Sequence, residues 1–182
     1  MSKLKVREMS LVALFPAMMA ATAGISIPIG NLPAVSLQTI FVFMSALLLG
    51  AKLGSLSMVI YTLMGIIGLP VFSGYRGGLD VIIGQSGGFV IGFVFSTIFI
   101  GFMKSINFLN NKKWYIFLVL VIGNLVIYIF GASYIAYLLN VDILPILATF
   151  TPYVIGDLLK ILVVLYVYYR IRNHLTYEGV QI

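Results

Sequence analysis

The stretch WYIFLVLVIGNLVIYIFGASYIAYLL, residues 114–139, contains no charged side chain. An α-helix needs about 20 consecutive apolar residues to cross the hydrocarbon core of a bilayer, so this stretch is long enough to span a membrane. Reading outward for similar apolar runs gives six spans, which lie near residues 9–27, 35–51, 54–70, 80–103, 114–139 and 146–170. The sequence therefore predicts an all-α integral membrane protein with six transmembrane helices, in which residues 1–182 form a single domain.

The composition of the whole chain agrees with a membrane protein. Of its 182 residues, 62% are hydrophobic and 9% are charged, whereas soluble domains are about 45–50% apolar and about 25% charged. This argues against a soluble enzyme, a nucleic-acid-binding module and a disordered tail. The chain has no cysteine and one histidine, so we expect neither a Cys/His metal site nor a His-based catalytic triad. It also has no phosphate-binding loop, and any ATP hydrolysis is expected on other chains.

The basic residues predict how the helices are oriented. Nine of the 11 lie near the N-terminus, in the loops near 52 and 104–113, or from the end of the last span onward: Lys3, Lys5, Arg7, Lys52, Lys104, Lys112, Lys113, Arg170 and Arg172. These places alternate along the chain with the loops near 28–34, 71–79 and 140–145, which hold only Arg76. Cytoplasmic loops are enriched in Lys and Arg. We therefore expect both termini in the cytoplasm and the loops near 28–34, 71–79 and 140–145 outside. The expected location is the plasma membrane of a bacterium or archaeon, with the chain crossing it several times.

The N-terminal segment has a second interpretation. A basic start, an apolar core and the small residues Ala21-Thr22-Ala23 are also typical of a signal peptide. Cleavage there would leave five helices and the same loop orientations, so the charge pattern fits both forms. We expect the segment to be kept as the first helix.

Two charged residues lie inside the last span, at Asp157 and Lys160. A charge at the bilayer centre costs about 2.5–3.5 kcal/mol on insertion scales, and such residues usually face a bundle interior or a water-filled cavity. At positions i and i+3 the two side chains share one helix face. They are therefore either an ion pair that fixes helix packing or part of a site for a polar ligand, and the second interpretation is favoured.

Small residues mark two further helix faces. Gly84, Gly88 and Gly92 are spaced by four, which predicts close helix packing. The spacing of Ala13, Ala17 and Ala21 is the same. It fits packing inside the bundle and docking onto another membrane helix equally well.

Five segments together resemble the BioY family, the biotin-specific substrate-binding (S) components of energy-coupling factor (ECF) transporters. They are GLPVFSG at 68–74, the glycine pair at 77–78, GQSGGFVIGF at 84–93, VSLQT at 35–39 and GDLLK at 156–160. The resemblance extends from the first helix to the last.

This resemblance implies a six-helix, S-component-like bundle that captures biotin from the outside with high affinity. Its partners would be membrane lipid, a transmembrane coupling protein that docks at Ala13, Ala17 and Ala21, and two cytoplasmic ATPase subunits. The chain would be neither an enzyme nor a cofactor protein, since biotin is its cargo. The expected substrate-binding residues are Asp157, Lys160, Gln38, Phe72, Arg76, Gln85, Ser86, Tyr128 and Tyr134.

The polarity of biotin in this site stays open at the level of sequence. Asp157 can accept from the ureido N–H groups while Lys160 donates to the ureido carbonyl, with Arg76 or Ser86 at the carboxylate. In the opposite arrangement Lys160 meets the carboxylate. The alternative functions are an S component for another vitamin and a small secondary transporter.

Overall fold

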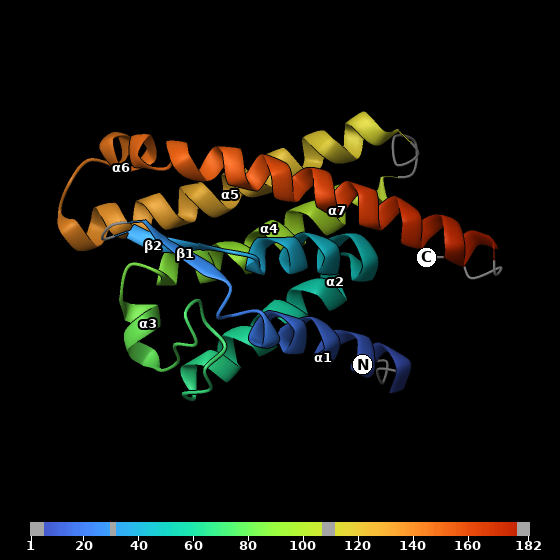
Figure 1. Cartoon of the computed structure of the whole chain (residues 1–182), viewed down its shortest axis with the longest axis horizontal. Helices are drawn as coiled ribbons and strands as arrows, with labels where there is room; N and C mark the ends of the chain where they lie inside the picture. Colours follow the sequence, from blue (N-terminus) through green and yellow to red (C-terminus); the bar gives the residue numbers. More distant parts are fainter. Residues whose placement is uncertain (1–5, 30–31, 107–111, 178–182) are drawn as a thin grey trace.

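The computed structural model describes residues 6–29, 32–106 and 112–177. Long helices run lengthwise beside one another, and a two-stranded hairpin and two short helices lie at one end (Figure 1). The elements in chain order are α1 (Val6–Ala21), β1 (Ser26–Ile29), β2 (Leu32–Ser36), α2 (Gln38–Ile66), α3 (Leu79–Ile83), α4 (Gly87–Ser105), α5 (Lys113–Leu139), α6 (Ile143–Thr149) and α7 (Thr151–Tyr177).

Helix α2 reverses direction at Gly50. The backbone there has φ 74° and ψ −175°, a conformation that is essentially restricted to glycine. The Gln38 side chain donates a hydrogen bond of 2.7 Å to the Tyr61 hydroxyl, although a straight helix would hold these residues about 35 Å apart. The two arms, 38–49 and 51–66, therefore lie side by side. They correspond to the second and third predicted spans, with the turn at Gly50 just before Lys52.

Three other predicted spans differ from the helices observed. The first was expected to reach residue 27, but α1 ends at Ala21, and β1 and β2 pair in an antiparallel hairpin. The all-α prediction missed this small sheet. Each strand contains one proline, which is tolerated because both strands of a two-stranded sheet are edge strands. The span 80–103 is two helices separated at Gly84, which is extended. The span 146–170 is α6 followed by α7, bent by 56°.

Helices α2, α4 and α5 are each long and apolar enough to cross a membrane, and α6 and α7 together make a fourth candidate. On α5, four large apolar side chains on one face are each about half exposed: Leu118, Ile122, Leu125 and Ile129. An exposed apolar stripe of this length is unfavourable in water. Contact with lipid acyl chains explains it, as expected for a membrane protein.

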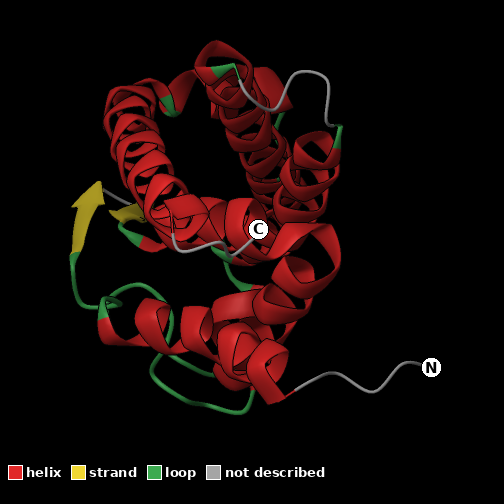
Figure 2. Cartoon of the chain, turned by 90° about the vertical axis from the view of Figure 1, so that its right-hand side faces the viewer, coloured by secondary structure: helices red, strands yellow, loops and turns green. Residues whose placement is uncertain are grey.

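Helix α4 packs between α2 and α5. A side chain at Gly88 would bring its Cβ within 2.5 Å of the Phe130 carbonyl oxygen on α5, and one at Gly92 within 3.0 Å of the Ile127 Cα atom. The predicted close packing is thus confirmed for these two glycines, whereas Gly84 lies at the end of α3. The start of α1 and the end of α7 lie at the same end of the bundle, opposite α3 and α6 (Figures 1 and 2).

Candidate functional site

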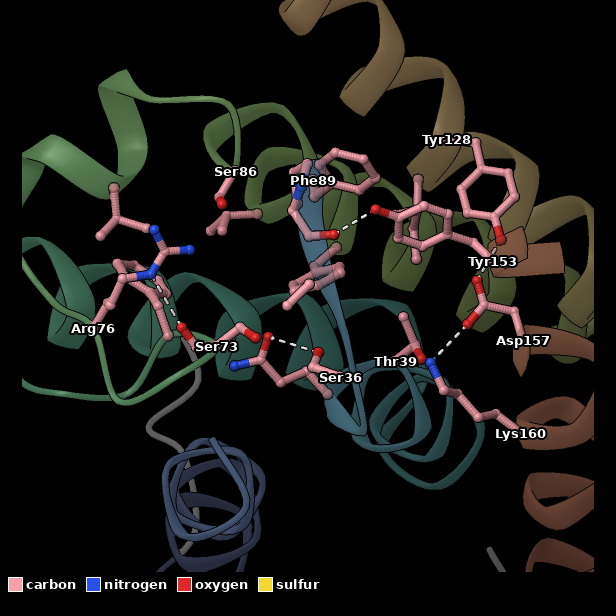
Figure 3. A pocket seen from close by; sticks show the side chains of 18 residues that line it. Ser36, Thr39, Ser73, Arg76, Ser86, Phe89, Tyr128, Tyr153, Asp157 and Lys160 are labelled. Carbon is pink, nitrogen blue, oxygen red and sulfur yellow. Dashed lines mark hydrogen bonds and ion pairs between the residues drawn. The ribbon is translucent and has the colours of Figure 1, made fainter. Parts of the chain in front are cut away.

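A cavity opens among β2, the first turn of α2, the loop before α3, and helices α4, α5 and α7. It encloses about 650 Å³, counted out to its open side. Its lining residues come from β2 and from the parts of the long helices nearest to α3 and α6 (Figure 1). Figure 3 shows the side chains that line it.

Seven of the nine side chains expected to bind substrate line this cavity: Gln38, Phe72, Arg76, Ser86, Tyr128, Asp157 and Lys160. The other two, Gln85 and Tyr134, are not part of its lining. The Tyr134 hydroxyl lies 3.1 Å from the carbonyl oxygens of Ile82 and Ile83. This contact holds the end of α3 against α5, and Tyr134 does not line the cavity with the other expected residues.

The carboxylate of Asp157 is the centre of a hydrogen-bond network. It is buried, with 4% of its surface exposed. Its Oδ1 atom accepts from the Lys160 ammonium at 2.8 Å. Its Oδ2 atom accepts from the Tyr128 hydroxyl and, at 3.4 Å, from the Asn124 amide. Both oxygens are thus already engaged by protein donors on α5 and α7.

Lys160 differs from Asp157 in that it retains donors for a ligand. Its ammonium has three N–H groups, and Asp157 is its hydrogen-bond partner among the described residues. The Lys160 side chain is 11% exposed and lines the cavity. The pair therefore presents N–H donors to the cavity while carrying no net charge.

Gln38 has a structural role at the cavity wall. Its amide N–H₂ donates to the Tyr61 hydroxyl at 2.7 Å and to the Val71 carbonyl at 3.1 Å. Its amide oxygen accepts from Ser36 at 3.2 Å. These contacts fix the loop that carries Phe72, so Gln38 positions the site as well as lining it.

Four polar side chains near the cavity were missed by the sequence reasoning. Tyr153 lies one helical turn before Asp157 on the same face of α7, and Asn124 lies one turn before Tyr128 on α5. That spacing was a usable signal. The buried hydroxyls of Thr39 and Ser73 line the cavity without a hydrogen-bond partner among the described residues. These hydroxyls are therefore available to a polar group that enters the cavity.

The charges are distributed toward opposite sides of the cavity, with Arg76 far from Asp157 and Lys160 (Figure 3). Arg76 donates through Nε to the Ser73 carbonyl at 3.2 Å and forms no ion pair with a described carboxylate. Aromatic rings such as those of Phe89 and Phe93 line the space. The arrangement suits an elongated ligand with a neutral polar head, an apolar middle and an anionic tail. Within the described ranges, no group of three or more His, Cys, Asp or Glu residues could hold a metal ion.

Comparison with known proteins relates this geometry to a family. Residues 1–177 match the model of the BioY family. The chain is 37% identical over 158 residues to a probable biotin transporter BioY of Pyrococcus horikoshii, covering 86% of this chain and 91% of that one. It is 34% identical over 168 residues to the biotin transporter BioY of Thermotoga maritima, covering 92% and 97%.

A crystal structure of the S-component for biotin from an ECF-type ABC transporter has a similar fold. The TM-score is 0.85 at 26% sequence identity, and the match covers 92% of each chain.

Proposed function

This chain belongs to the BioY family, and we propose that it is the S component through which an ATP-driven ECF transporter takes up biotin. The observation that carries this proposal is the structural match to a biotin S-component over 92% of both chains. The proposal assigns the chain substrate binding, with residues 1–182 as one substrate-binding domain, and assigns ATP hydrolysis to other subunits.

The charge distribution in the cavity supports one orientation of biotin. Biotin has a neutral ureido head, an apolar ring and a valerate carboxylate. The ureido head suits the charge-balanced pair of Asp157 and Lys160, with a Lys160 N–H donating to the ureido carbonyl. The carboxylate suits Arg76, which has no carboxylate partner among the described residues. The unpaired hydroxyls of Thr39 and Ser73 supply further polar contacts.

Binding by the purified chain tests this proposal. We expect biotin to bind one to one. Thiamine, riboflavin, folate and pantothenate should bind at least about a hundredfold more weakly, because they lack the ureido head and the spacing that would bring a neutral polar group to Lys160 and a carboxylate to Arg76 together. Preference for a different vitamin would make the chain an S component for that compound. Biotin uptake driven by a proton gradient without ATP would instead indicate a secondary transporter.

The proposed topology has six spans with both termini in the cytoplasm. Taking the two arms of α2 separately, α1, both arms, α4, α5 and α7 make six helical segments. Because the chain has no cysteine, single cysteines can report the side on which a residue lies. A cysteine at Ser105 should react with a membrane-impermeant reagent only after lysis, and one at Tyr75 should react on intact cells. The reverse pattern would invert the topology.

The outer face of α1 is the proposed docking surface for the coupling protein. Ala13, Ala17 and Ala21 are all exposed, whereas Phe15 and Met19 on the same helix are buried. Of the two interpretations of this spacing, the exposure favours contact with another membrane helix over packing inside the bundle. The partner would be the ECF transmembrane protein, with two cytoplasmic ATPases attached.

A further inference from the structure

A second groove lies far from the cavity, between the beginning of α5 and the last turns of α7. Its lining is formed by Lys113, Leu165, Tyr166, Tyr169 and Arg170, and it encloses about 810 Å³, counted out to its open side. The groove lies near the end of the bundle where the described chain begins and ends, opposite α3 and α6 (Figure 1). None of these residues lines the proposed biotin site.

Two cations from different helices are held at this groove. The Lys113 ammonium lies 5.6 Å from the centre of the Tyr169 ring, within cation–π distance. The Arg170 guanidinium donates to the Tyr166 hydroxyl at 3.0 Å. Neither cation forms an ion pair with a described carboxylate, and no acidic side chain lines the groove. The groove therefore has an uncompensated positive charge.

The surroundings of the two cations are those of a membrane surface. Trp114, at the start of α5, and Tyr166, on α7, are both more than half exposed, and Trp and Tyr are enriched at the headgroup level of a membrane. Large apolar side chains continue from there along the outer faces of both helices, at Leu118 on α5 and Leu162 on α7. A ligand here would meet cations at one end and apolar surface at the other.

We propose that this groove binds the phosphodiester headgroup of an anionic phospholipid, with Lys113 and Arg170 as its two cationic contacts. A guanidinium offers paired N–H donors that match phosphate oxygens, and an ammonium adds a compact charge. Basic pockets between transmembrane helices are known to recognise lipid headgroups. The acyl chains lie along the apolar faces of α5 and α7.

The chemistry favours a lipid over free phosphate. Leu165 and the ring of Tyr169 form part of the groove wall, and a small hydrated anion gains nothing from covering them. A phospholipid covers that surface and keeps its phosphate at the cations. The two sources differ in a measurable way, because only the lipid requires acyl chains for binding.

The test uses the full-length purified protein in detergent. Phosphatidylglycerol and phosphatidylcholine with identical acyl chains are titrated separately, and bound lipid is counted by native mass spectrometry. We expect phosphatidylglycerol to bind preferentially. Each of Lys113→Gln and Arg170→Gln should weaken it about fivefold, and the double variant about 25-fold. Glycerol phosphate should not displace it.

Two control variants separate the groove from general surface charge and from folding. Tyr166→Phe removes the hydrogen bond to Arg170 but keeps both cations, and should retain most of the lipid affinity. Lys52→Gln removes an exposed cation at the turn of α2 and should leave lipid binding unchanged. Biotin affinity reports whether each variant is folded. Equal binding of the two lipids, equal losses in Lys52→Gln and Arg170→Gln, or full displacement by glycerol phosphate would each overturn the proposal.

Discussion

Replacing Asp157 by asparagine removes the negative charge at the centre of the proposed biotin site while keeping the side-chain shape. The native carboxylate accepts from Lys160 at 2.8 Å, from Tyr128 and from Asn124. An asparagine has one acceptor oxygen and an N–H₂ group that donates. Its oxygen can stay with Lys160 only if its N–H₂ group faces Tyr128 and Asn124. The Lys160 ammonium then keeps a hydrogen bond but loses its counter-charge.

The size of the effect follows from the hydrogen bonds lost. A hydrogen bond to a charged group is worth about 1.5–3 kcal/mol. At about 1.4 kcal/mol per decade of affinity, replacing the charged acceptor that orients Lys160 by a neutral one should weaken biotin binding roughly ten- to a hundredfold. Lys160→Met removes the proposed ligand donor itself, so a loss of the same order is expected. Each single change leaves a buried group without its partner and should also lower the melting temperature.

The assay compares biotin affinity and melting temperature in Asp157→Asn, Lys160→Met, the double variant and the native chain. Asp142→Asn is the matched control, because it makes the same change at an exposed carboxylate outside the cavity. If the pair binds biotin, the double variant should regain stability but not affinity. Near-normal affinity in the double variant would refute the reasoning and leave an ion pair that only fixes helix packing.

Three further predictions concern other parts of the molecule. Arg76→Gln should weaken biotin about tenfold but leave an uncharged biotin amide unaffected in calorimetric titrations; equal losses for both would separate Arg76 from the carboxylate. Gly65→Ala would place a Cβ 1.9 Å from the Phe72 ring, so it should displace that ring and reduce biotin affinity about tenfold; unchanged affinity would show that Phe72 is not needed. Ala17→Leu should abolish copurification with the coupling protein and ATP-driven uptake while biotin binding persists, whereas lost binding in an intact complex would make this face internal packing.

The parts of the fold that depend on local sequence could be predicted. Apolar runs located the long helices, since the requirement for about 20 apolar residues does not depend on the rest of the fold. The i, i+3 spacing placed Asp157 and Lys160 on one face of α7, and the observed distance of 2.8 Å agrees. Gly88 and Gly92 were interpreted correctly as a packing surface for the same reason.

Features that depend on distant contacts could not be predicted. Gln38 lines the cavity, but the contacts by which it positions the Phe72 loop, from its amide to Tyr61 and Val71, are made with residues 23 and 33 positions away. Tyr134 was also expected to bind substrate, and its hydroxyl instead contacts the carbonyls of α3, 51 and 52 residues earlier. The spacing of residues along one helix predicts neighbours on that helix, but not contacts with residues far away in the sequence.

The short elements were missed for a related reason. The hairpin of β1 and β2 covers the end of the first predicted span, the loop expected near 28–34 and the start of the second span, and its strand pairing depends on contacts between the two strands. The break at Gly84 and the bend between α6 and α7 interrupt runs that are apolar enough on average to be taken for one span each. Composition alone does not distinguish such a run from one continuous helix.

The content of the cavity after purification tests biotin capture most directly. The native chain and the Asp157→Asn variant are purified in detergent from cells grown with biotin, denatured, and analysed by mass spectrometry for released small molecules. We expect about one biotin per native chain and much less in the variant. Two results would contradict the proposed function. One is a folded native chain that carries no biotin, even after biotin is added and the excess is removed; the other is a native chain that carries a different vitamin.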